Sequence, residues 1–107
     1  MLSEIAQQIA ELIAENSKGY NALYEAEVKL AYAEQELDLV EQREFIKQEG
    51  TIADRNALAR LAASQARLER DLRKAEASRI RMKIRSLESA LMALATQAKL
   101  LQSEMRL

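Results

Sequence analysis

Apolar residues recur at helical spacing along the whole chain, separated by polar and charged positions. Between about residues 2 and 16 they fall three or four apart, at Leu2, Ile5, Ile9, Leu12 and Ile13. Between about residues 20 and 49, Leu23, Leu30 and Leu37 are seven apart, with Tyr20, Tyr24, Val28 and Ala31 beside them. Spacings of three, four and seven place side chains on one face of a helix, so both segments are predicted to be amphipathic helices.

Two glycines divide this pattern. Asn16-Ser17-Lys18-Gly19 predicts a helix stop, or a kink between two nearly collinear helices, because glycine adopts the left-handed conformation that ends helices. Gly50-Thr51 is the sharper signal, since Gly50 follows a polar run and Thr51 can cap the next helix, with Asp54 three residues later. A stop and a start so close together predict an antiparallel helical hairpin that turns at residues 50–51.

The third segment, about residues 52–106, contains no glycine or proline and is expected to form one long helix. Its apolar residues follow two registers. The first runs through Leu58, Leu61, Gln65, Leu68, Leu72 and Ala75, and the second through Ile80, Ile84, Leu87, Leu91, Leu94, Ala98, Leu101 and Met105. The step from Ala75 to Ile80 is five residues, which indicates a phase slip near Ser78.

The hairpin turn sets the expected pairing of the two arms. A turn at residues 50–51 places Tyr20 near Arg81, so the break at Gly19 faces the phase slip near Ser78. Beyond it, the third segment packs against either the first segment or a second subunit. Its narrow, leucine-rich stripe is typical of coiled coils made of several chains. We therefore expect a homo-oligomer held by Ile80, Ile84, Leu87, Leu91, Leu94, Leu101 and Met105.

Composition supports an all-α, coiled-coil-type single domain over residues 1–107 and argues against an enzyme. Strong helix formers dominate, and the chain has no proline, cysteine, histidine or tryptophan. Without histidine or cysteine, the commonest general base, thiolate nucleophile and zinc ligands are missing, and no glycine-rich phosphate loop is present. We expect no cofactor and no metal. No signal peptide or membrane span is recognisable, so a cytoplasmic protein without membrane association is expected.

Charge is distributed unevenly along the chain. Residues 1–50 contain four basic and eleven acidic side chains, and residues 51–107 contain twelve basic and six acidic ones. The densest basic stretch comprises Arg60, Arg67, Arg70, Arg73, Lys74, Arg79, Arg81, Lys83 and Arg85. Arginine forks match phosphate geometry, so these nine residues are candidate nucleic-acid contacts that would read backbone rather than sequence. The alternative is that they pair with the acidic arm, whose charges fix the hairpin.

The three tyrosines have two interpretations as well. Tyr20, Tyr24 and Tyr32 lie on one helical stripe, where the favoured interpretation is core or subunit contact and the other is base stacking.

An acidic helix with Tyr20, Leu23, Tyr24, Ala26 and Leu30, the turn from Glu49 to Arg55, and a long alanine-arginine-leucine helix together resemble a known family. They are similar to the small phage proteins grouped with the UvsY recombination mediators. The resemblance covers most of the chain and is one of architecture. It implies a helical, self-assembling protein that binds single-stranded DNA and helps to load a RecA-type recombinase onto DNA coated by single-strand-binding protein, in the cytoplasm of a phage-infected bacterium.

The leading expectation is therefore an oligomeric single-stranded DNA-binding recombination accessory. Two rival functions stay open. One is a small phage-type inhibitor or adaptor that docks its acidic face (residues 25–44) on a host enzyme. The other is a structural coiled-coil scaffold whose charges serve only to set pairing.

Overall fold

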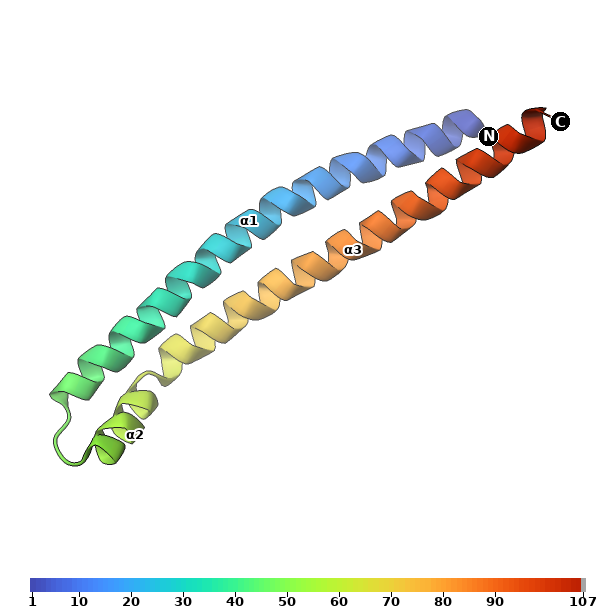
Figure 1. The fold of residues 1–107 in the computed structure, drawn as a ribbon. Coiled ribbons are helices and arrows are strands. Elements are labelled where there is room, and N and C mark those ends of the chain that lie inside the picture. The colour runs from blue at the N-terminus through green and yellow to red at the C-terminus, as the bar shows by residue number, and fades with distance from the viewer. Residues whose placement is uncertain (107) are drawn as a thin grey trace. The chain divides into compact units, whose positions relative to one another are not determined.

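The protein is all-α. A computed structural model describes residues 1–106, and they form three helices (Figure 1): α1, Leu2–Lys47; α2, Ile52–Ala62; and α3, Ser64–Arg106. No strand occurs in this described range. The chain reverses direction between α1 and α2, so the fold is the predicted helical hairpin. The chain divides into two compact units, the terminal unit (Met1–Leu23 with Arg79–Leu107) and the turn unit (Tyr24–Ser78).

Gly19 does not end a helix. The prediction of separate helices at about 2–16 and 20–49 is wrong, because α1 runs through Gly19 without interruption and only Gly50 has a positive φ among the described residues. Glycine inside a helix costs about 1 kcal/mol relative to alanine. Close packing explains its presence here, since a Cβ placed at Gly19 would lie 3.1 Å from Cγ1 of Ile84 on α3. Gly19 therefore allows the two helices of the terminal unit to approach.

The turn is built as the sequence predicts. Gly50 has a φ of +112°, and the Thr51 hydroxyl accepts a hydrogen bond of 3.1 Å from the Asp54 amide, which caps α2. A second contact, which the sequence analysis missed, joins the start of α2 to the end of α1. Two guanidinium nitrogens of Arg55 donate to the Phe45 carbonyl at 3.1 and 3.3 Å, and the guanidinium stacks 4.1 Å from the centre of the Phe45 ring. Arg55 thus holds the end of α1, where carbonyls lack helical partners.

The long segment after the turn is two helices rather than one. It breaks at Ala63, which has φ −88° and ψ 10°, and α3 then passes through Ser78 without interruption. The break stays close to helical geometry, because Ala63 donates to the Ala59 carbonyl and accepts from Arg67, both at 3.0 Å. The Arg67 side chain donates at 3.1 Å to the Arg60 carbonyl, in the last turn of α2, and so satisfies an acceptor beside the break.

Buried and half-buried residues of α1 form one row with alternating steps of three and four, which we call the α1 contact row. In the terminal unit it comprises Leu2, Ile5, Ile9, Leu12, Asn16, Gly19 and Leu23, and in the turn unit Ala26, Leu30, Ala33, Leu37 and Val40. The matching row of the other arm comprises Ala59, Ala63, Ala66, Arg70, Arg73 and Ala77 in the turn unit, and Ile80, Ile84, Leu87, Leu91, Leu94, Ala98 and Leu101 in the terminal unit.

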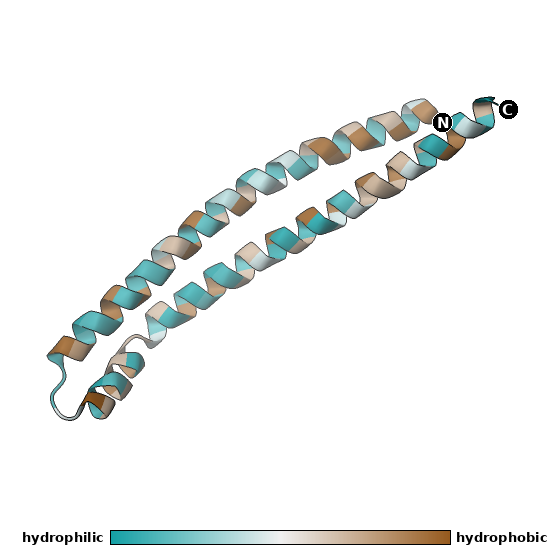
Figure 2. Cartoon of the chain, in the orientation of Figure 1, coloured by the Kyte–Doolittle hydropathy of each residue, from teal (hydrophilic) through white to brown (hydrophobic). Residues whose placement is uncertain are grey.

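These rows correct the predicted phase slip. The contact row of α3 keeps its alternation of three and four through Ser78. The apparent slip arises because Leu58, Leu61, Leu68 and Leu72 belong to a different row, which is exposed, whereas Ile80 and Ile84 belong to the contact row. Apolar and polar residues accordingly alternate along every helix (Figure 2).

Candidate nucleic-acid interface

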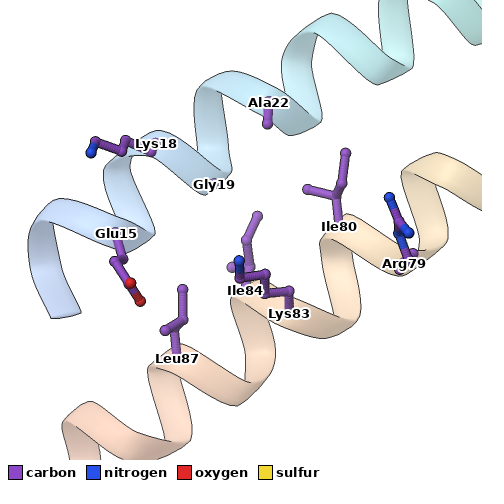
Figure 3. A pocket seen from close by; sticks show the side chains of 9 residues that line it. All are labelled: Glu15, Lys18, Gly19, Ala22, Arg79, Ile80, Lys83, Ile84 and Leu87. Carbon is purple, nitrogen blue, oxygen red and sulfur yellow. The ribbon is translucent and has the colours of Figure 1, made fainter.

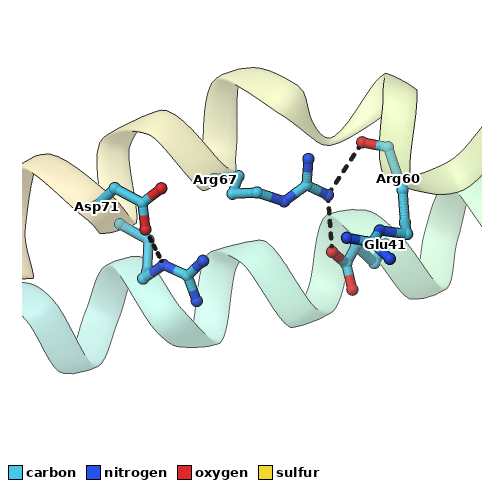
Figure 4. Close-up of polar contacts among 5 residues, drawn as sticks. Glu41, Arg60, Arg67 and Asp71 are labelled. Carbon is cyan, nitrogen blue, oxygen red and sulfur yellow. Dashed lines mark hydrogen bonds and ion pairs between the residues drawn. The ribbon is translucent and has the colours of Figure 1, made fainter.

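Arg67, one of the nine predicted phosphate contacts, is used inside the turn unit. One of its guanidinium nitrogens donates at 3.2 Å to Glu41 on α1 and at 3.1 Å to the Arg60 carbonyl (Figure 4). Both charged side chains are partly covered. This ion pair joins the acidic arm to the basic arm, as the alternative interpretation of the basic stretch expected.

Arg70 and Arg73 also have acidic neighbours within the turn unit. Arg70 donates to Asp71 at 2.7 Å (Figure 4), and Arg73 donates to Glu69 at 2.8 Å and lies 3.5 Å from Glu76. Both arginines occupy the contact row and are half-buried. Their charge is already compensated, so they are poorly placed to attract a polyanion.

Arg60 and Lys74 are exposed and flank Arg67 at intervals of seven residues. A step of seven residues along each arm from the Glu41–Arg67 pair leads to Glu34 for Lys74 but to the uncharged Gln48 for Arg60. The whole turn unit contains nine basic and twelve acidic side chains. Of the basic residues in this series, Arg67 has an observed pair with an acid of α1, which indicates that Arg67 helps to set the hairpin pairing.

The terminal unit has the opposite balance. It contains seven basic and five acidic side chains, and four of the basic ones, Arg79, Arg81, Lys83 and Arg85, fall within seven consecutive residues of α3. No acidic residue lies between Ala77 and Leu87. Arg79, Lys83 and Arg85 are exposed, while Arg81 is half-buried and has an interaction partner. We call these four residues the basic strip.

Beside the basic strip is a hollow of about 590 Å³ between the two helices of the terminal unit (Figure 3). Ile80, Ile84 and Leu87 point from α3 toward Gly19 and Ala22 on α1 and form its apolar lining. The charged residues that line it are Glu15, Lys18, Arg79 and Lys83. Small residues on α1 therefore leave space beside three cations and one carboxylate, and Lys18 joins the candidate site although the sequence analysis did not select it.

Tyr20 lies one residue beyond Gly19 and has a half-exposed ring. Its hydroxyl donates a hydrogen bond of 2.5 Å to Glu88 on α3, within the terminal unit. This bond and the negative charge of Glu88 both raise the pKa of Tyr20 above its ordinary value. The bond fixes the ring at the surface. The close approach of Gly19 to Ile84 places this part of α1 a few residues further along α3 than the expected position opposite Arg81.

Tyr20, Tyr24 and Tyr32 are all exposed, so the expectation that they form the core of the chain is wrong. Their alternative roles, in subunit contact or base stacking, stay predictions. The acidic face offered for an adaptor is partly used within the chain, since Glu36 pairs with Arg43, Glu41 with Arg67 and Glu44 with Lys47.

The predicted oligomerisation residues lie mostly in the contact row of the terminal unit. Ile84 is buried, and Ile80, Leu87, Leu91, Leu94 and Leu101 are half-buried, whereas Met105 is 74% exposed. The sequence left two possible partners for this stripe, the first segment of the same chain or a second subunit. In the terminal unit, the stripe packs against the first segment of the same chain. A subunit contact through these residues stays a prediction.

Within residues 1–106, no cluster of three or more acidic side chains is arranged to hold a metal ion. None of the helices in that range combines the length and the apolar character needed to cross a membrane. Comparison of the chain with protein-family models, with curated proteins and with solved structures found no match.

Proposed function

We propose that the protein is a homo-oligomeric, single-stranded DNA-binding accessory of DNA recombination, and that its phosphate contacts come from the basic strip. The observation that carries the proposal is the cluster of exposed cations Arg79, Lys83 and Arg85 on α3, in a stretch without any acidic residue between Ala77 and Leu87. This narrows the nine candidate residues to Arg79, Arg81, Lys83 and Arg85, with Lys18 beside them.

The arrangement of the strip favours a polyanionic ligand. Arg79 and Lys83 are four residues apart on one helix face, as are Arg81 and Arg85. Like charges at this spacing destabilise a helix by about 0.2–0.5 kcal/mol per pair. A bound phosphate backbone relieves that repulsion and releases counterions, which makes binding favourable and salt-dependent.

The exposed ring of Tyr20 favours single-stranded DNA over duplex DNA as the ligand. Base stacking on an exposed aromatic ring requires an unpaired base, and Tyr20 presents a half-exposed ring held by Glu88. The role as a recombination mediator, with a RecA-type recombinase and a single-strand-binding protein as partners, follows from the resemblance to the UvsY-like family and belongs to the proposal on that ground alone.

Binding of labelled oligo(dT) and of a duplex of equal length, measured by fluorescence anisotropy over a series of salt concentrations, tests the proposal. The triple substitution Arg79→Gln, Lys83→Gln and Arg85→Gln is expected to weaken binding at least tenfold. Each phosphate contact in a single strand contributes about 0.7 to the slope of log K against log salt, so the slope should fall by about two.

The matched control is the pair Arg60→Gln and Lys74→Gln in the turn unit, where both residues are exposed. This pair should change binding much less than the strip variant, while circular dichroism shows that both proteins keep their helicity. No binding by the wild-type protein at low salt contradicts the proposal and leaves the scaffold as the better explanation. Equal loss in both variants contradicts the assignment to the strip.

A further inference from the structure

The turn unit exposes a row of leucines. Leu58 and Leu61 on α2 are 43% and 72% exposed, and Leu68 and Leu72 on α3 are 52% and 57% exposed. With Gln65 between them they are spaced by three and four, the pattern of a coiled-coil seam. We call these four residues the leucine row.

The leucine row is continuous across the break at Ala63. The hydrogen bonds Ala63 to Ala59 and Arg67 to Ala63 both span four residues, so α2 and α3 stay nearly in helical phase. The side that faces α1 carries the alanines instead, and Ala59 and Ala63 are buried there. Larger side chains thus lie outside and the smallest ones inside, the reverse of what a lone helical pair needs to bury apolar area.

Charges beside the leucine row are compensated within the chain. Glu69 and Glu76 pair with Arg73, and Asp71 pairs with Arg70. A neighbouring helix would therefore meet an apolar stripe bordered by neutral pairs, not a row of unpaired acids. This matters for association between identical copies, because like charges at the borders of a seam oppose pairing.

The exposed surface of the chain is large enough to supply an interface. A folded monomer of 12.1 kDa exposes about 6,000 Å² by the usual scaling with mass. This chain exposes 8195 Å². A standard interface buries roughly 800 Å² per partner, so this surface is large enough to supply one, and the leucine row is an exposed apolar stripe within it.

We propose that the leucine row is the face through which copies of this chain associate. This inference rests on the homo-oligomer of the proposed function and assigns its interface to the turn unit, leaving Ile80–Met105 to pack within the chain. It also separates assembly from the basic strip, which lies in the terminal unit.

The molar mass of the full-length protein in solution, measured by light scattering, tests whether copies associate through the leucine row. The wild type should have a mass well above 12.1 kDa, and the double variant Leu61→Gln and Leu68→Gln should weaken self-association at least a hundredfold. The matched control, Met92→Gln and Leu100→Gln, replaces two equally exposed apolar residues of the terminal unit and should leave the mass unchanged.

A second variant covers the case in which the glutamine pair fails to fold. Leu72→Cys introduces the only thiol of the chain, and a short bifunctional maleimide should cross-link it between copies, whereas Met92→Cys should stay uncross-linked. An oligomer that keeps its mass in the glutamine variant and gives no cross-link at residue 72 overturns this inference alone. A wild type that stays monomeric at about 100 µM, a hundred times a micromolar dissociation constant, overturns the homo-oligomer as well. If the protein forms an oligomer but does not bind DNA, only the proposed DNA-binding function is overturned.

Discussion

The terminal unit and the turn unit differ in which side chains they bury and in how their charges are paired. In the terminal unit isoleucine and leucine occupy most of the contact rows, with Ile5 and Ile84 buried, and Arg79, Lys83 and Arg85 of the basic strip are exposed. In the turn unit alanines fill most of the contact row of α2 and α3, the leucines of that stretch are exposed, and Arg67, Arg70 and Arg73 pair with acids. Along the arm after the turn, the large apolar side chains therefore face α1 in the terminal unit and face away from it in the turn unit. This contrast is the basis for proposing that ligand binding and self-association use different stretches of the hairpin.

The largest expected effect comes from emptying the contact row of the terminal unit. Ile84→Ala should lower the free energy of unfolding by about 2–4 kcal/mol, because it removes buried methyl groups and leaves a cavity beside Gly19. Leu72→Ala should cost less than about 1 kcal/mol in dilute solution, since Leu72 is exposed in the turn unit. Urea unfolding at matched low protein concentration measures both. Similar losses would erase the contrast between the units.

The next test places larger side chains in the contact row of α2 and α3 within the turn unit. Four of its residues are alanines, and we call them the alanine row: Ala59, Ala63, Ala66 and Ala77. Ala77 is fully buried, so Ala77→Leu should destabilise the protein by about 1–3 kcal/mol through crowding against α1. Ala75→Leu, two residues earlier and exposed, should be within about 0.5 kcal/mol of the wild type. Thermal unfolding followed by circular dichroism compares the two variants. Equal tolerance of leucine at both positions would show that the alanines are not the tightly packed side.

Asn16 is the polar side chain in the α1 contact row of the terminal unit. Its Oδ1 atom is buried without a hydrogen-bond partner. Asn16→Leu should raise the free energy of unfolding by about 1 kcal/mol, because an unsatisfied buried acceptor is replaced by apolar contact. A polar residue in such a row also fixes register, so the gain should come with weaker preference for a single alignment of the arms. A stability loss in urea unfolding would contradict this interpretation.

The smallest effect concerns pH. The carboxylate of Glu88 raises the pKa of Tyr20, so the folded state favours the neutral phenol more than the unfolded state does. This contribution is fully present below the ordinary tyrosine pKa of about 10 and is lost as pH rises through the raised pKa. Stability should therefore decline more steeply at alkaline pH in the wild type than in Tyr20→Phe. Parallel pH profiles would show that the bond contributes nothing.

The fold was largely predictable because its signals are local. Gly50, Thr51 and the spacing of leucines predicted the turn and the helical hairpin, and the structure confirms both, although the helices begin and end at other residues than expected. The orientation of the arms was harder to predict, because residues 58–77 contain two rows at heptad spacing, one of leucines and one of alanines. Leucine has the larger apolar surface, so the sequence favoured the wrong inward row, and the switch to Ile80 then resembled a phase slip.

The candidate site was predictable only in part for a related reason. Nine basic residues share one stretch of sequence, yet Arg67 finds Glu41 on the other arm, a partner 26 residues away that only the fold brings near. Gly19 misled in the same way, since glycine marks both helix ends and close helix contacts, and only the position of Ile84 distinguishes them.

The reactivity of single cysteines tests the central contrast most directly, because the chain has no native cysteine. Ala77→Cys and Leu72→Cys lie on the same helix of the turn unit, one in the alanine row and the other in the leucine row. The account predicts that, in dilute solution, a maleimide modifies residue 72 at least about a hundredfold faster than residue 77, since Ala77 is fully buried and buried thiols are inert. Modification of both thiols at the same rate, or faster modification of residue 77, would contradict it.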